Sequence, residues 1–185
     1  MKFEKTNFHG LIVIYPNVHN DDRGYFYESF KKPVFDSLGL SSDFVQDNQA
    51  LSKKNTLRGL HYQLKYPQGK LVQVILGKVY DVALDIRRGS PTFGEYFGII
   101  LSDENHKIVY VPKGFAHGYS VLSETAIFQY KCTDIYHQED EHGILWNDPS
   151  LKIDWKTTQP HISKKDLKSP PLNDVELSSL PIFKK

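Results

Sequence analysis

The sequence is poor in features that would point to secretion, membranes or nucleic acids. It contains one cysteine, Cys132, and so cannot form an internal disulfide bond. Its 23 lysines and arginines balance 22 aspartates and glutamates, and the net charge of +1 lacks the basic excess typical of nucleic-acid binders. No apolar run approaches the roughly 18 to 20 residues needed to cross a bilayer, and the first segment, MKFEKTNFHGLIVIY, lacks the pattern of a secretory leader. We therefore expect a cytoplasmic protein that binds neither nucleic acid nor membrane.

Several chemical signatures are also missing. There is no glycine-rich phosphate loop and no dinucleotide fingerprint. Metal-binding barrels commonly use two histidines two residues apart, on one strand face, but Gln63 stands two residues after His61 and no histidine stands two residues from His117. Cys132 shares a strand face with Phe128, so we expect a small buried side chain rather than a nucleophile. We expect no metal and no cofactor.

The composition and the pattern of apolar runs indicate an all-β fold. With 185 residues, of which 39% are hydrophobic, the chain is long enough for one core, and we expect a single domain over residues 1–185. Short runs rich in valine, isoleucine, tyrosine and phenylalanine alternate with turn residues, as in sandwiches and barrels. These runs cover residues 11–15, 24–30, 71–86, 96–101, 107–111, 118–122 and 125–133. The run at 71–86 is too long for one strand, so we expect a hairpin that turns at Gly77 and Lys78.

Two segments depart from the strand pattern. Residues 33–38 predict a short helix that ends at Gly39, and Ser163 and Asp166 have the spacing of a helix capping box. The chain after Trp155 is polar and contains several prolines. We expect a β core over residues 11–155 and a segment, 156–185, that wraps around it.

Residues 56–63 and 68–70 concentrate ionisable side chains. His61 can exchange protons near neutral pH, and Arg58 and Lys70 suit anionic oxygens. They favour an acid–base site for an anionic substrate, although a buried structural histidine with two surface charges fits the pattern equally well. Arg58 and His61 are three residues apart and would face opposite sides of a regular strand, so we expect a bulge at Gly59.

Two aspartates interrupt an otherwise apolar stretch. Asp81, Asp85 and Arg87 share one face of the expected strand. Buried carboxylates are costly unless they are paired. We expect Asp85 and Arg87 to pair on a solvated face, whereas Asp81 is a candidate to orient a histidine.

A second histidine and a tyrosine complete the candidates. His117 follows a turn at residues 112–114. Tyr130 shares a strand face with Phe128 and Cys132, where a tyrosine usually packs in a core. If that face lines a cavity, the phenol can act as a proton donor.

Taken in order, these segments resemble the dTDP-4-dehydrorhamnose 3,5-epimerases of the cupin superfamily. The matching segments are residues 22–29, 44–48, 57–63, 68–72, 81–87, 90–94, 112–118, 130–131 and 144–148. The resemblance implies a cupin-type jelly-roll β-barrel or sandwich with a few short peripheral helices. It also implies a cofactor-free isomerase that binds a dTDP-linked keto-sugar, and a homodimer that exchanges N-terminal strands.

The resemblance also implies roles for individual residues. His61 matches the general base, Tyr130 the acid on the opposite sugar face, and Lys70 the group that stabilises the enolate oxygen. Asp166 matches the carboxylate that supports His61, which competes with its place in a capping box, and Asp81 matches a polar support near Lys70. The positions that match nucleotide-sugar binding residues are Arg23, Phe26, Glu28, Gln46, Asp47, Asn48, Arg58, His117, Tyr136, Glu141 and Lys165. Arg23 and Phe26 are expected to reach into the site of the partner subunit.

The implied reaction is epimerisation of dTDP-4-dehydro-6-deoxy-D-glucose at carbons 3 and 5, giving dTDP-4-dehydro-L-rhamnose. A base removes a proton next to the ketone and an acid returns one to the other face. An epimerase acting on carbon 3 or carbon 5 alone is the nearest alternative. More distant alternatives are a metal-dependent cupin oxygenase using His61 and His117, and a sugar-nucleotide binding module.

Overall fold

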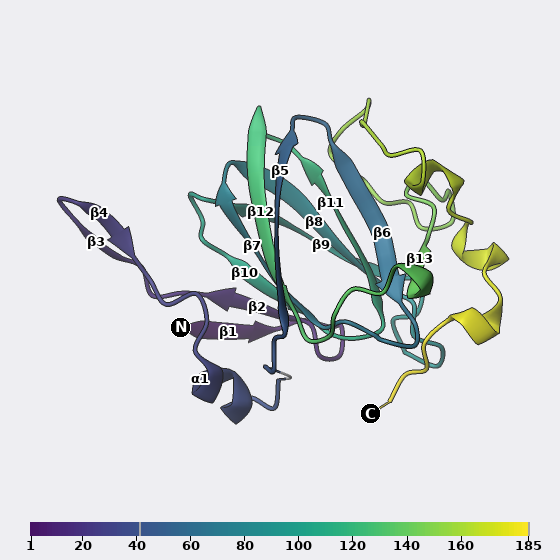
Figure 1. Cartoon of the computed structure of the whole chain (residues 1–185), viewed down its shortest axis with the longest axis horizontal. Coiled ribbons are helices and arrows are strands. Elements are labelled where there is room, and N and C mark those ends of the chain that lie inside the picture. Colours follow the sequence, from purple (N-terminus) through teal and green to yellow (C-terminus); the bar gives the residue numbers. More distant parts are fainter. Residues whose placement is uncertain (41, 185) are drawn as a thin grey trace.

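Two antiparallel sheets face each other in the computed structural model, which describes residues 1–40 and 42–184 (Figure 1). The six-stranded sheet has the order β1 (Lys2–Lys5), β2 (Ile12–Tyr15), β10 (Ile108–Val111), β7 (Lys70–Leu76), β12 (Thr125–Cys132) and β5 (Gln46–Lys53). The five-stranded sheet has the order β13 (Glu141–Gly143), β6 (Leu57–Gln63), β11 (Phe115–Val121), β8 (Lys78–Asp85) and β9 (Tyr96–Ser102). The predicted all-β sandwich is confirmed.

The remaining elements lie outside the sandwich. A two-stranded arm, β3 (His19–Asp21) and β4 (Gly24–Phe26), projects away from the sheets at the left of Figure 1. The helix α1 (Lys32–Ser37) confirms the predicted short helix, and Gly39 follows it with a left-handed φ of 69°. Four 3₁₀ turns complete the described chain: η1 (Gln138–Asp140), η2 (Asp166–Lys168), η3 (Leu172–Asp174) and η4 (Leu177–Ser179). No helix of the described residues is long and apolar enough to span a membrane.

Alternating side chains fill the space between the sheets. Val72 and Val74 of β7 meet Ala83 of β8 and Phe128 of β12 in one buried cluster. The other face of β8 is buried as well, because Val82 and its apolar neighbours pack against the C-terminal segment. The five-stranded sheet is therefore covered on both faces, which explains the near-continuous apolar run of β8.

The chain turns at Gly77, with φ 79°, but the predicted hairpin is wrong. β7 pairs with β10 and β12, whereas β8 pairs with β9 and β11. The turn carries the chain from one sheet to the other. Gly77 marks where the first strand ends, and only the long-range pairing decides which strands become neighbours.

Asp85 and Arg87 pair as expected, but the predicted solvated face is wrong. Their exposed fractions are 0% and 6%, and Arg87 Nη2 lies 2.7 Å from Asp85 Oδ2. The hydroxyls of Ser90 and Thr92 also donate to Asp85, and the guanidinium lies 4.3 Å from the ring centroid of Phe115. Burial is tolerated because nearly every polar atom of the pair has a partner.

Candidate functional site

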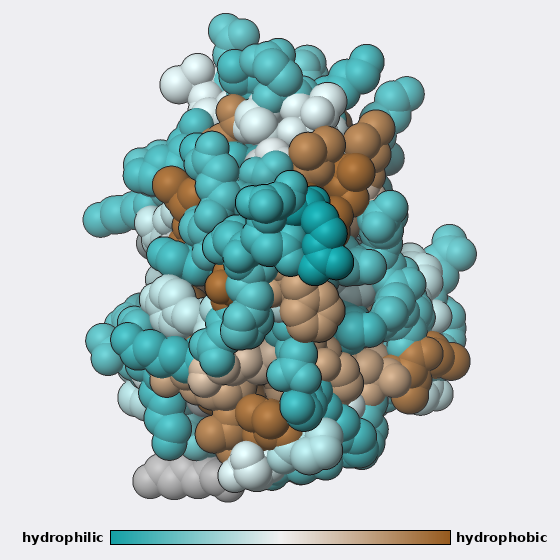
Figure 2. All heavy atoms as spheres, turned by 90° about the vertical axis from the view of Figure 1, so that its left-hand side faces the viewer, coloured by the Kyte–Doolittle hydropathy of each residue, from teal (hydrophilic) through white to brown (hydrophobic). Residues whose placement is uncertain are grey.

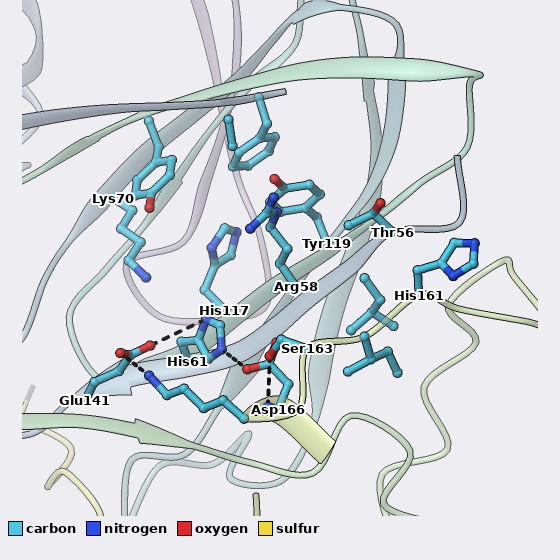
Figure 3. A pocket seen from close by; sticks show the side chains of 17 residues that line it. Thr56, Arg58, His61, Lys70, His117, Tyr119, Glu141, His161, Ser163 and Asp166 are labelled. Atoms are coloured by element: carbon cyan, nitrogen blue, oxygen red, sulfur yellow. Dashed lines mark hydrogen bonds and ion pairs between the residues drawn. The ribbon is translucent and has the colours of Figure 1, made fainter. Parts of the chain in front are cut away.

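A hollow of about 530 Å³ opens between the two sheets and is closed on one side by the C-terminal segment (Figure 3). Lys70 and Tyr130 come from the six-stranded sheet, whereas Arg58, His61 and His117 come from the five-stranded sheet. A cavity of this size fits a small-molecule ligand. Because the two sheets face each other, side chains on opposite walls can contact opposite sides of one ligand.

A bulge in β6 brings Arg58 and His61 to the same hollow. His61 pairs with His117 and Arg58 pairs with Tyr119, so two residues of β6 stand opposite Gly118 alone. Gly59 has φ 128°, and a Cβ built on it would lie 2.5 Å from the Cα of Gly118. Glycine is therefore required here, and the predicted bulge is confirmed.

His61 is bound by a carboxylate from the far end of the chain. Its Nε2 lies 2.7 Å from Oδ1 of Asp166, which is 4% exposed (Figure 3). Burial by itself would raise the pKa of Asp166, but the hydrogen bond and charge of His61 outweigh it, with Ser163 and the Gly59 backbone helping, so the pKa is lowered. The carboxylate is thus ionised at neutral pH and can hold one nitrogen of the imidazole.

The capping-box prediction is half fulfilled. The backbone N–H of Asp166 donates to Ser163 Oγ at 3.0 Å, as the spacing predicts. The Asp166 carboxylate, however, turns to His61 instead of returning to the Ser163 backbone. The segment is a 3₁₀ turn, η2, and not an α-helix.

Glu141 forms a second charged group beside His61. Its carboxylate accepts hydrogen bonds from Lys165 and from the Tyr136 hydroxyl, and its Oε1 lies 4.0 Å from His61 Nδ1. Burial favours a higher pKa for Glu141, but the bonds from Lys165 and Tyr136 prevail, and the pKa is lowered. The hydrogen bond that the Tyr136 hydroxyl donates to Glu141 also raises the pKa of Tyr136 to about 12. The candidates Tyr136, Glu141 and Lys165 therefore form one cluster at the rim of the hollow.

A second histidine–carboxylate pair lies deeper. His117 Nε2 is 2.9 Å from Asp81 Oδ2, and both side chains are buried. Asp81 thus contacts His117 and not His61. Asp81 also lies close enough to Lys70 that its negative charge favours the protonated ammonium.

Lys70 and Tyr130 present polar atoms from the opposite wall. Burial lowers the pKa of Lys70, and the nearby acidic groups of Cys132, Asp81 and Glu141 oppose this effect. The ammonium lies 5.9 Å from the centroid of the Tyr130 ring. Burial also raises the pKa of Tyr130 to about 12. The tyrosine therefore carries its proton at neutral pH.

Arg58 and Tyr119 flank the far end of the hollow. Arg58 Nε donates to Ser52 Oγ at 3.2 Å. Tyr119 stacks on Phe128 with 4.1 Å between ring centroids, and burial raises the pKa of its hydroxyl. Sequence reasoning assigned Tyr119 no role, although its position two residues after His117 places both side chains on one strand face.

Several candidates lie outside the hollow of their own chain. Arg23 and Phe26 belong to the projecting arm, and Glu28 follows it. Asp47 is on the outer face of β5, where it forms an ion pair with Lys131 at 2.8 Å.

Gln46 and Asn48 lie on the opposite face of β5, near the rim. Gln46 Nε2 donates to Asn48 Oδ1 at 3.0 Å, and Gln46 Oε1 accepts from the backbone N–H of Tyr136. Both side chains thus adjoin the cluster around Glu141.

Metal-ligating side chains are not grouped in the described residues. Over 1–40 and 42–184, no three His, Cys, Asp or Glu side chains form a cluster that could hold an ion. His61 and His117 instead each contact a carboxylate.

Comparisons with known proteins identify the family. The model of the dTDP-4-dehydrorhamnose 3,5-epimerase family matches residues 5–174. The dTDP-4-dehydrorhamnose 3,5-epimerase of Methanothermobacter thermautotrophicus is 48% identical over 94% of this chain and 95% of its own length.

Solved structures agree with this sequence match. The dTDP-6-deoxy-D-glucose-3,5-epimerase of Legionella pneumophila, crystallised with dTDP-4-keto-L-rhamnose, is 48% identical, with a TM-score of 0.96 over 100% of this chain and 99% of that one. A 3′-monoepimerase from Streptomyces bikiniensis, in complex with dTDP-quinovose, is 31% identical, with a TM-score of 0.89 over 96% and 91% of the two chains. The fold is therefore of the cupin type predicted, and the chain belongs to the dTDP-4-dehydrorhamnose 3,5-epimerase family.

Proposed function

We propose that the protein is a dTDP-4-dehydrorhamnose 3,5-epimerase, an isomerase that inverts carbons 3 and 5 of a dTDP-linked 4-keto-6-deoxyhexose. The observation that carries this proposal is that His61 and Tyr130, from opposite sheets, line one hollow together with Lys70. Inversion next to a ketone requires a base on one side of the ring and an acid on the other. Family membership favours this isomerase over an oxygenase or a binding module.

His61 acts as the general base. When its Nε2–H donates to Asp166, the lone pair of Nδ1 is free to accept a proton from carbon. The ionised Asp166 stabilises the imidazolium that forms, in the manner of other orienting carboxylates. General base catalysis of this type contributes about 10²- to 10⁴-fold.

Lys70 stabilises the enolate oxygen. As the proton leaves carbon, negative charge moves to the carbonyl oxygen, and a positioned cation stabilises it more strongly than it stabilises the ketone. Burial brings the pKa of Lys70 below its ordinary value, whereas the surrounding acidic groups favour the charged form. An ammonium in a partly dry cavity interacts more strongly with the developing charge than one in water.

Tyr130 returns the proton from the opposite wall. Its raised pKa of about 12 keeps the phenol protonated until a strongly basic carbanion-like partner forms. The base and the acid belong to different sheets, so the flat enolate can be protonated on the face opposite the one that lost a proton. His61 then releases its proton to solvent and Tyr130 takes one up, so that the same two steps at the second carbon invert both centres without electron transfer.

The nucleotide diphosphate binds beyond the sugar. Arg58 supplies a guanidinium that matches phosphate oxygens bidentately, and His117 lies beside it on the neighbouring strand. Gln46, Asn48 and Tyr136 at the rim provide further polar contacts. Structures of relatives with bound dTDP-4-keto-L-rhamnose and TDP support a ligand of this class.

A homodimer would complete each site. Arg23 and Phe26 lie on the exposed arm formed by β3 and β4, which projects away from the two sheets of its own subunit, and Phe26 is 68% exposed. From the arm's side of the molecule, apolar patches lie among hydrophilic side chains (Figure 2). The exposed aromatic side chains of the arm, Tyr25 and Phe26, fit a partner surface better than they fit water. We infer that the arm reaches the hollow of the partner subunit.

Subunit mixing tests the dimer. Arg23→Ala and His61→Ala chains, each inactive alone, should regain activity when they are mixed and refolded together. With random pairing, about one site in four then combines an intact arm with an intact base. Mixing that restores no activity would show that the arm serves its own chain.

The activity itself is tested in deuterium oxide. Incubation with dTDP-4-keto-6-deoxyglucose should place deuterium at carbons 3 and 5, as followed by proton NMR, and should give dTDP-4-keto-L-rhamnose. Deuterium at one carbon only would assign a monoepimerase. No deuterium at either carbon, together with tight binding of the nucleotide sugar, would replace the proposal with a binding module.

A further inference from the structure

A second cavity of about 520 Å³ lies away from the hollow between the sheets. We call it the basic cavity, and it is lined by Leu64, Arg87, Arg88, Lys113, Pro181 and Lys184 together with neighbouring residues. These residues come from the end of β6, the segment after β8, the turn before β11 and the last described residues of the chain. None of them lines the first hollow. The volume falls in the range of small-molecule sites.

Adjacent arginines in this cavity differ in their bonding. Arg87 donates through Nε and Nη2 to Asp85 and through Nη1 to the His9 carbonyl, so its charge is neutralised within the fold. Arg88 has no ion pair with a described residue, and its Nε is buried without a hydrogen-bond partner. Because this Nε is out of reach of solvent, the capacity of Arg88 to bind an anion in the cavity lies in the charge of its guanidinium, which no described acid neutralises.

Two lysines add to the positive charge. Lys113 and Lys184 also line the cavity, and neither forms an ion pair with another described residue. No aspartate or glutamate is among the lining residues. Apolar side chains such as Leu64 and Leu180 form much of the wall. Walls of low dielectric strengthen the field of the half-buried Arg88, and the exposed Lys113 and Lys184 add positive charge that solvent screens more strongly.

We propose that the basic cavity is a binding site for a phosphate ester with an apolar body, separate from the site of epimerisation. The Arg88 guanidinium matches two phosphate oxygens, and Lys113 and Lys184 neutralise the remaining charge. The apolar part of the ligand contacts Leu64 and Leu180. This assignment goes beyond the proposed function and does not depend on it.

The C-terminal residues form one wall and give the site a local readout. The Arg88 N–H donates to the Pro181 carbonyl at 2.8 Å, and the Phe183 N–H donates to the Arg88 carbonyl at 3.0 Å. A ligand that bridges Lys113 and Lys184 would hold this wall against the turn before β11. Binding should therefore slow hydrogen exchange of the Phe183 amide.

Phenyl phosphate is the probe, titrated calorimetrically in an Arg58→Gln background that weakens anion binding in the first hollow. In that background, adding Arg88→Gln and Lys113→Gln should weaken binding by about tenfold or more, since the two substitutions remove two positive charges that face the phosphate. Adding Lys53→Gln and Lys152→Gln, two exposed lysines outside both cavities, removes the same charge and should leave binding unchanged.

Two further measurements decide the assignment. With Arg58 intact, the Arg88→Gln, Lys113→Gln variant should retain full epimerase activity, which shows that it folds. In the Arg58→Gln background, equal affinity for phenyl phosphate with the Arg88→Gln, Lys113→Gln pair and with the lysine control pair would overturn the proposal. Benzoate that binds as tightly as phenyl phosphate would also overturn it. Inorganic phosphate should bind more weakly than the ester, and unchanged exchange at Phe183 on saturation would contradict the predicted location.

Discussion

Replacing Asp166 by asparagine should lower kcat strongly and leave KM almost unchanged. The carboxylate lies 2.7 Å from His61 Nε2 and is 4% exposed, so its main effect on the reaction passes through the imidazole. The lowered pKa of Asp166 means that the wild-type side chain is charged at neutral pH. Asparagine keeps the shape and an acceptor oxygen but removes the charge that stabilises the imidazolium.

The size of the loss follows from the bond that is weakened. A hydrogen bond to a charged group contributes about 1.5–3 kcal/mol, and the imidazolium exists only after proton transfer. At about 1.4 kcal/mol for each factor of ten, kcat should fall by about 10- to 140-fold. Because the ground state is little affected, the loss should appear in kcat and not in KM.

Steady-state kinetics with dTDP-4-keto-6-deoxyglucose measures both constants. Asp174→Asn is the matched control, since it removes an exposed carboxylate from the same C-terminal segment. If kcat of Asp166→Asn lies within twofold of the control, Asp166 does not support the base. If KM rises while kcat is unchanged, the carboxylate contributes to binding instead of to proton transfer.

Three further predictions concern other parts of the molecule. Lys70→Met should reduce kcat by about 10²- to 10³-fold, because it removes the cation at the enolate oxygen, and a kcat close to wild type would refute that role. Gly59→Ala should lower both the melting temperature and the activity, since its Cβ would meet Gly118 Cα at 2.5 Å, and calorimetry showing wild-type stability would contradict the close contact. Asp85→Asn should cost about 3–5 kcal/mol of unfolding free energy in urea titrations because it leaves Arg87 buried and unpaired. Burial favours a higher pKa for Asp85, but its hydrogen bonds have the larger effect, and the pKa in the folded protein is lowered. The stabilisation by this carboxylate is therefore present above the unfolded pKa near 3.8 and is lost as the pH falls through the lower pKa of the folded state. A wild-type unfolding free energy that does not change below pH 4 would contradict this.

The alternation of side chains made much of the site visible in the sequence. Phe128, Tyr130 and Cys132 do share one face of β12, and Asp81 and Asp85 do share one face of β8, opposite Val82 and Leu84. The bulge at Gly59 followed from the same parity argument, because Arg58 and His61 could not otherwise share a cavity. Local geometry was sufficient in these cases.

Long-range contacts were beyond the reach of such reasoning. His61 and Asp166 are 105 positions apart, and the local spacing of Asp166 pointed only to a helix cap. β5 was not among the runs expected to form strands, because Gln46, Asn48 and Ser52 make its inner face polar. That polarity is explained by the cavity the strand lines, which no local pattern reveals. The sheet change at Gly77 likewise depends on which strands pair.

The most direct test of the account compares His61→Ala with Tyr130→Phe for hydrogen exchange and inversion in deuterium oxide. Loss of the base should abolish deuterium uptake at both carbons, whereas loss of the acid should still permit some uptake while impairing formation of the inverted product. Equal loss of uptake and inversion in the two variants would contradict a base and an acid acting from opposite sides of the sugar.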